Sequence, residues 1–137
     1  MSGLRIVLDT HILISSISRK SPFHWVYQKL LEGEFILCVT TDILNEYEEL
    51  LERFWGAQTA GFVLEAMIHL PNLEKSEVYF RWQLVKNDPD DNKFVDCAVA
   101  CNANLFVSHD KHFSSLKDIA FQPVKVISAD SFKLLLA

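Results

Sequence analysis

The sequence is poor in glycine and proline, with four of each among 137 residues. So few turn-forming residues argue against disorder and against a turn-rich all-β fold. Long hydrophobic runs are also absent, because no apolar segment approaches the roughly 18 residues that cross a bilayer. The opening MSGLRIVLDT holds too short an apolar run for a secretory signal. We therefore expect a cytoplasmic protein with no membrane partner.

Cysteine is scarce too, with three copies at positions 38, 97 and 101. Cys97 and Cys101 stand one helical turn apart rather than in a Cys-x-x-Cys pair, and no zinc-ligand spacing involves them. We interpret all three as reduced thiols in or near the core.

Positive charge is in deficit, with 13 basic against 18 acidic residues and a net charge of −5. Taken alone, this balance disfavours a polyanionic partner such as nucleic acid. Net charge does not describe charge distribution, however, and a bound metal cation inverts the local field of an acidic pocket. Composition therefore leaves the partner open.

Half of the residues are hydrophobic. This content is enough for one hydrophobic core, so we expect a single domain that spans residues 1–137. The pattern predicts strands at 4–8, 35–39, 104–107 and 124–127, a short helix within 10–18, and helices at 22–32, 42–54, 58–70, 91–101 and 130–136. Residues 72–86 fit either a strand or a partly helical segment. Strands joined through such helices predict an α/β fold, a three-layer α/β/α sandwich with a central parallel sheet.

Two of the predicted strands lead into an acid: Asp9 follows RIVL, and Asp110 follows LFVSH. Ligands of parallel sheets bind outside the carboxyl ends of the strands. An acid at that place is costly to desolvate unless it is paired or binds a metal. Taken singly, either aspartate is better explained as a helix N-cap or turn residue.

The predicted helix at 42–54 supplies a third acid. On a helical wheel its buried stripe consists of Ile43, Tyr47, Leu50, Leu51 and Phe54. Glu46 lies closest to that stripe among the acids of the helix, whereas Glu48, Glu49 and Glu52 form a solvated face. Glu46 is therefore expected at the border of the core, facing along the edge of the sheet.

The fourth acid comes from a segment that holds Asp88, Asp90, Asp91 and Asp96. The wheel of the helix at 91–101 directs Asp91 toward the apolar stripe and Asp96 toward solvent. Asp90 suits the N-cap position. We choose Asp91, with an ambiguity of one to three residues, and interpret Asp96 as a surface acid.

Four carboxylates brought together repel one another, so at least one titrates upward unless a cation is bound. A site of oxygen ligands suits Mg²⁺ or Mn²⁺, and no His/Cys set is spaced for zinc. Such a site can deprotonate a water molecule, orient it in line with a phosphorus atom and stabilise the leaving oxygen. Hydrolysis of a phosphodiester is the predicted reaction.

Three segments together resemble the PIN-domain family. VLDTHILISSI resembles its opening strand and helix, TTDILNEYEELL its second block with a central glutamate, and DPDDNKFVDCAVACNANLFVSHDKHF its third block. The resemblance runs from residue 5 to about 113. No single block is specific, but the three in order are a strong signal.

The resemblance implies a PIN-like (5'-nuclease-like) fold and Mg²⁺- or Mn²⁺-dependent cleavage of single-stranded RNA. By motif position, the metal-binding and catalytic residues are Asp9, Glu46, Asp91 and Asp110. Thr10, His11 and Ser108 are expected to support them, although the family usually has Asn at position 11. Many small members are toxins neutralised by an antitoxin protein, and many form homodimers, so both partners are expected here.

Several basic residues are candidate RNA contacts near the acidic edge: Arg19, Lys20, Lys93, Lys111 and His112. Solvated surface lysines are an equally good explanation. Trp25, Trp55 and Trp82 could stack on bases, but core or interface roles are favoured for Trp25 and Trp55.

Two other classes of α/β protein fit the same residues less well. A receiver-like signalling domain needs an acid pair after the first strand and a lysine ending a late strand, where this chain has Asp9 alone and Ser-His-Asp. A phosphatase with an aspartyl nucleophile needs Asp-x-Asp, but position 11 is His. A catalytically weak PIN-like module that acts through protein partners stays open, because His11 departs from the family pattern.

Overall fold

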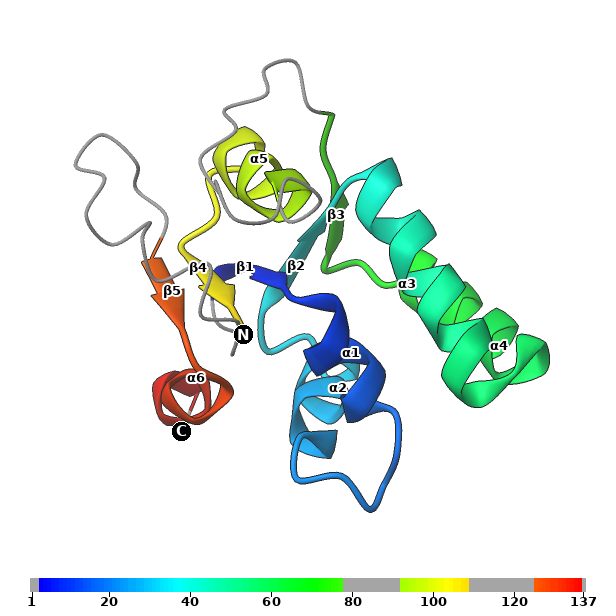
Figure 1. The fold of residues 1–137 in the computed structure, drawn as a ribbon. Helices are drawn as coiled ribbons and strands as arrows, with labels where there is room; N and C mark the ends of the chain where they lie inside the picture. Colours follow the sequence, from blue (N-terminus) through cyan, green and yellow to red (C-terminus); the bar gives the residue numbers. More distant parts are fainter. Residues whose placement is uncertain (1–2, 78–91, 109–124, 137) are drawn as a thin grey trace.

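The structure is a computed structural model that describes residues 3–77, 92–108 and 125–136. These residues form a five-stranded sheet in which every neighbouring pair is parallel (Figure 1). The strands are β1 (Arg5–Leu8), β2 (Ile36–Val39), β3 (Leu73–Lys75), β4 (Leu105–Val107) and β5 (Lys125–Ile127). They are ordered β3-β2-β1-β4-β5. The predicted central parallel sheet is confirmed.

Helices alternate with these strands: α1 (Thr10–Ser16), α2 (His24–Leu31), α3 (Thr41–Trp55), α4 (Ala57–Ile68), α5 (Asn92–Ala100) and α6 (Ala129–Leu136). Figure 1 shows α5 on one face of the sheet and α1, α2 and α6 on the other. The rings of Phe94 on α5 and Phe106 on β4 stack at 5.5 Å, and Phe132 on α6 contacts both Trp25 and Phe35. The α/β/α layering is confirmed.

The segment that the sequence left open, 72–86, contributes the edge strand β3 at its start. Residues 78–86 lie outside the described residues, so the rest of that prediction is untested. The buried stripe predicted for α3 is correct for Ile43, Tyr47 and Leu51 but wrong for Phe54, which is 57% exposed. The last turn of α3 belongs to a hairpin with α4 that extends beyond the sheet (Figure 1), so Phe54 has no sheet to pack against.

The three cysteines are free thiols, and all are buried. Cys38 lies on β2, Cys97 lies on α5, the helix that packs against this part of the sheet, and Cys101 directly follows the end of α5. Hydrogen bonding with Cys101 and burial raise the pKa of the Cys38 and Cys97 thiols. The interpretation of these residues as reduced core thiols agrees with their placement.

The strand order reverses at β1: the chain proceeds to β2 and β3 on one side, and β4 and β5 lie on the other. In open parallel sheets, ligands bind in the crevice at the carboxyl ends of the two strands that flank such a reversal. Here those strands are β1 and β4, which pair from Ile6–Leu105 to Leu8–Val107. No helix within the described ranges is long and apolar enough to cross a membrane.

Candidate functional site

Asp9 and Ser108 are the first residues after β1 and β4, at the reversal of strand order. The Asp9 amide donates to the Val107 carbonyl at 3.0 Å, and the Ser108 amide donates to the Ile127 carbonyl at 3.0 Å. These hydrogen bonds extend the parallel strand pairing by one residue beyond the ends of β1 and β4. The Ser108 hydroxyl then donates to Asp9 Oδ2 at 3.0 Å, and both residues are buried, with 9% exposure for Asp9. One oxygen of Asp9 is therefore held by Ser108 at the carboxyl ends of β1 and β4, the place where open parallel sheets commonly bind ligands.

Glu46 reaches this edge of the sheet from α3. Thr40 caps the helix, because its hydroxyl oxygen accepts from the Ile43 amide at 3.2 Å. The Tyr47 hydroxyl donates to the Leu8 carbonyl at 2.7 Å, which fixes the rotation of α3 against the end of β1. This rotation sets the position of the Glu46 side chain. Its carboxylate accepts a hydrogen bond from the Thr10 hydroxyl and forms an ion pair with Lys93 Nζ at 2.7 Å.

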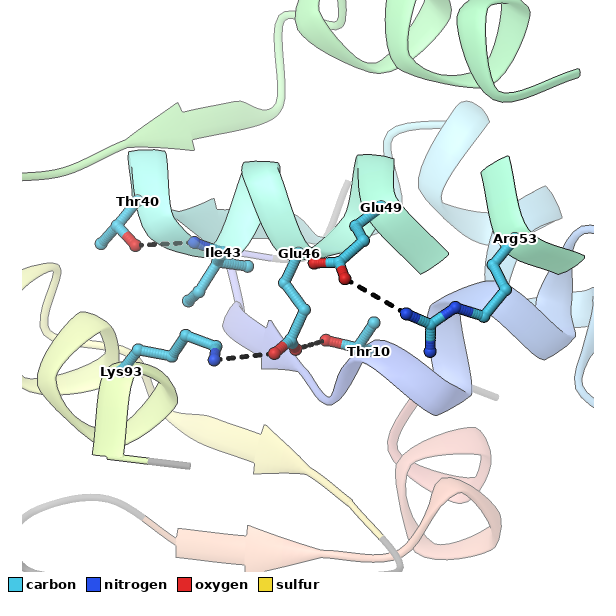
Figure 2. A network of polar contacts seen from close by, with 7 residues as sticks. All are labelled: Thr10, Thr40, Ile43, Glu46, Glu49, Arg53 and Lys93. Carbon is cyan, nitrogen blue, oxygen red and sulfur yellow. Dashed lines mark hydrogen bonds and ion pairs between the residues drawn. The ribbon is translucent and has the colours of Figure 1, made fainter. Parts of the chain in front are cut away.

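The directions of Glu46 and Glu49 on α3 are visible in Figure 2. Glu46 points toward Thr10 and Lys93, whereas Glu49 points toward Arg53 on its own helix, at 3.2 Å. The Glu46 side chain is 28% exposed, and Glu48, Glu49 and Glu52 are exposed. The predicted position of Glu46 at the border of the core, and of the other three acids on a solvated face, agrees with the structure.

The charges of Asp9 and Glu46 both affect the pKa of Tyr47. Tyr47 is fully buried, and burial raises the pKa of its hydroxyl well above the ordinary value. The negative charges of Asp9 and Glu46 raise that pKa further, after a contribution from Cys97. The Tyr47 hydroxyl therefore stays protonated and serves as a donor to the Leu8 carbonyl.

The remaining predicted residues divide into three groups. Lys93 is held at the site by Glu46. Arg19 and Lys20 are exposed in the turn after α1, and His11 is exposed in the first turn of α1. Asp91, Asp110, Lys111 and His112 lie outside the described residues, so their predicted roles as ligands or RNA contacts stay predictions.

The prediction that Asp96 is a surface acid is wrong, because Asp96 is 5% exposed. Residues 94–98 are all buried, since α5 packs against the sheet and also contacts α3. A helical wheel assumes one solvated face, and the middle of this helix has none. Asp96 stands three residues after Lys93, so the two side chains are neighbours on α5. The sequence did not predict this buried carboxylate beside Lys93, the residue that pairs with Glu46.

Within the described part of the chain, no three Asp, Glu, His or Cys side chains converge closely enough to hold a metal ion. Asp9 and Glu46 supply carboxylate oxygens from two elements, and a third acid from outside these residues is needed for a full ligand set. Asp91 immediately precedes α5, and Asp110 stands two residues after Ser108. These two are the candidates that remain from the sequence.

Carboxylates where the strand order of a parallel sheet reverses define a class of α/β protein. In this class the ligand site lies at the carboxyl ends of the strands. Within this class, the family model of the PIN domain matches residues 5–112. The chain belongs to the PIN-domain family. Among curated proteins, no sequence matches this chain.

Twelve chains of solved structures match this fold, and two of them illustrate the similarity. One is VapBC2 from Rickettsia felis bound to a DNA fragment from their promoter, with a TM-score of 0.62 and 12% identity over 91% of this chain and 98% of that chain. The other is Mycobacterium tuberculosis VapC20, a sarcin-ricin loop cleaving toxin, with a TM-score of 0.61 and 17% identity over 81% of this chain and 94% of that chain. Identities this low establish the common fold alone.

Proposed function

We propose that the protein is a Mg²⁺- or Mn²⁺-dependent endoribonuclease that hydrolyses phosphodiester bonds of single-stranded RNA. The observation that carries the proposal is the hydrogen bond of Ser108 to the buried carboxylate of Asp9 at the strand reversal. Membership of the PIN-domain family and the fold shared with VapC20, a toxin that cleaves the sarcin-ricin loop, support the same reading.

The residues present fit a divalent cation. Asp9 and Glu46 offer the hard oxygen ligands that Mg²⁺ and Mn²⁺ prefer. The Lys93 ammonium lies 2.7 Å from Glu46 Oε1, so positive charge is already favoured at this carboxylate. In the proposal, Asp9 and Glu46 hold the metal with Asp91 and Asp110.

When bound, a divalent cation supplies an activated water and charge neutralisation at the phosphate. The chain's own part is positioning. Ser108 orients one oxygen of Asp9, and Thr10 orients one oxygen of Glu46. Such hydroxyl contacts fix the ligand oxygens before substrate arrives, which is the kind of preorganisation that metal sites require. Arg19, Lys20, Lys93, Lys111 and His112 are the candidate contacts to the RNA backbone.

The proposed biological role is that of a toxin controlled by an antitoxin protein, with self-association as a homodimer. The structure offers apolar surface for protein partners: Phe54, Phe62 and Ile68 on the α3–α4 hairpin are exposed by 57%, 70% and 53%. Contiguous exposed apolar patches mark interaction surfaces, and this hairpin is the proposed contact for a protein partner. VapBC2 of Rickettsia felis, whose fold this chain shares, is the relevant comparison.

The proposal is tested by cleavage of a generic single-stranded RNA with Mn²⁺ and with EDTA, together with the melting temperature in both conditions. Wild type should cleave only with metal and should gain thermal stability with Mn²⁺. Asp9→Asn and Glu46→Gln should lose cleavage by a factor of about 100 or more and lose the thermal gain. Glu48→Gln is the matched control, because Glu48 is exposed two residues from Glu46 on the same helix.

If wild type and Asp9→Asn behave alike, the nuclease proposal fails. A second candidate would then stand, a PIN-like binding module that acts through protein partners. It is favoured by the exposed apolar side chains of the α3–α4 hairpin. Co-purification with a protein partner, unaffected by Asp9→Asn and by EDTA, would identify it.

A further inference from the structure

We propose that Lys93 is an internal counter-ion that holds the place of a cation at Glu46, so that a divalent metal must displace it to bind. This inference rests on the proposed metal-dependent function. It assigns Lys93 a role in setting the affinity for the metal, which is distinct from contact with RNA.

The geometry shows that both oxygens of Glu46 are engaged. Oε1 lies 2.7 Å from Lys93 Nζ, and Oε2 accepts from the Thr10 hydroxyl (Figure 2). Each carboxylate oxygen keeps a further lone pair, but a metal ion bound at Oε1 would lie close to the Lys93 ammonium and be repelled by it. Because Thr10 is a neutral donor and Lys93 carries a full charge, the ammonium is the group that an incoming cation competes with.

The partial burial of the pair makes this competition strong. The side chains of Lys93 and Glu46 are 22% and 28% exposed, so solvent screens their attraction less than it screens an ordinary surface pair. The Lys93 ammonium also lies 5.6 Å from the centroid of the Phe94 ring, a second favourable contact for a cation. Phe94 itself is fixed in the core by stacking on Phe106.

The position of Lys93 in its helix is unfavourable on local grounds. It is the second residue of α5, where the helix dipole presents its positive end and disfavours a cation. The charge of Lys93 is therefore balanced by carboxylates and not by the helix dipole: Glu46 on α3 pairs with it at 2.7 Å, and Asp96 stands three residues further along α5.

The same placement predicts the consequence of removing the charge. Without Lys93, Glu46 keeps its partly buried carboxylate but loses its cationic partner, so a divalent metal gains the interaction without displacing an ammonium. Repulsion between the metal and a nearby ammonium is removed as well. Metal affinity should rise, while the metal-free protein becomes less stable.

The experiment is calorimetric titration of the full chain with Mn²⁺ for wild type, Lys93→Gln and Lys93→Arg. Lys93→Gln should bind Mn²⁺ about tenfold more tightly than wild type. Lys93→Arg keeps the charge and should stay near the wild-type affinity. Arg53→Gln is the matched control, because it removes a positive charge that pairs with Glu49 on the same helix as Glu46, and it should change the affinity less than twofold.

A second readout is the melting temperature. Lys93→Gln should melt below wild type in EDTA, and its gain with Mn²⁺ should exceed the wild-type gain. Equal or weaker Mn²⁺ binding by Lys93→Gln, with wild type binding normally, overturns the role of Lys93 and leaves the nuclease proposal intact. Absence of Mn²⁺ binding in wild type and in every variant overturns the metal-dependent function itself.

Discussion

Ser108 shows how a single hydroxyl positions a candidate ligand. It stands one residue beyond β4, its amide is held by the Ile127 carbonyl, and its side chain donates to Asp9 Oδ2. Both partners are buried, so the bond is shielded from competition with water. This contact holds one oxygen of the Asp9 carboxylate at the carboxyl ends of β1 and β4.

Ser108→Ala should weaken Mn²⁺ binding by about tenfold, because loss of an outer hydrogen bond to a metal ligand typically costs that much. Calorimetric titration measures the effect. Ser131→Ala is the control, since Ser131 is an exposed serine whose hydroxyl contacts only Ser128 among the described residues. Equal Mn²⁺ affinity in Ser108→Ala and wild type would show that Ser108 does not contribute to metal binding.

At the scale of elements, the turn between α3 and α4 depends on a glycine. Gly56 ends α3 with φ 89° and ψ 160°, a conformation almost restricted to glycine. A Cβ at this position would meet no atom within 4 Å, so the constraint lies in the backbone and not in packing. This turn lets α4 fold back along α3 as a hairpin.

Gly56→Ala should lower the free energy of unfolding by about 2 kcal/mol. Gly61→Ala, in the interior of α4 with open space around its Cβ, should raise it by about 0.5 to 1 kcal/mol, because alanine favours the helix. Urea denaturation of the two variants measures both effects. If both substitutions shift stability in the same direction, the backbone explanation for Gly56 is wrong.

The start of α3 shows how hydrogen bonds at two points of a helix position a candidate site residue. Thr40 caps the helix, and the Tyr47 hydroxyl anchors its second turn on the Leu8 carbonyl of β1. Glu46 is adjacent to Tyr47, so the anchor fixes where the carboxylate can lie. The position of Glu46, a candidate ligand, therefore depends on the hydrogen bond of its buried neighbour Tyr47.

At the scale of the whole molecule, an ion pair spans the sheet. Arg5 on β1 contacts Glu74 on the edge strand β3 at 2.6 Å, passing across β2, and its Nε donates to the Cys101 carbonyl at 2.7 Å. Arg5 therefore joins β1, β3 and the turn that follows α5. Its hydrogen bond to Glu74 raises the pKa of Arg5 and lowers the pKa of Glu74.

The pH dependence of stability follows from the lowered pKa of Glu74. The stabilisation is fully present above the ordinary glutamate pKa of 4.5 and is lost as the pH falls through the lower pKa of the folded state. Glu74→Gln should cost about 1 kcal/mol or less at neutral pH, because the Glu74 side chain is 43% exposed.

Urea denaturation across pH checks this expectation: the difference between wild type and Glu74→Gln should be constant above pH 4.5 and should shrink below it. Glu32→Gln is the control, because its ion pair with Lys29 is longer, at 3.8 Å, and exposed. A difference that grows at acid pH would contradict the assignment.

The sequence by itself determined the alternation of strands and helices, the parallel sheet and the placement of Asp9 and Glu46. Those features depend on local periodicity and on the residues that end each element, which the chain carries in short segments. The edge strand β3 was the uncertain element, because its three residues are too short to show a period and are only partly buried.

Only the tertiary structure decided the partners of those residues. The contact of Glu46 with Lys93, the bond of Ser108 to Asp9 and the burial of Asp96 join segments far apart in the chain, or depend on how α5 packs. A helical wheel finds one apolar face, whereas the middle of α5 is enclosed on all sides. Local sequence sets which residues can reach the sheet edge, and packing sets what each of them meets there.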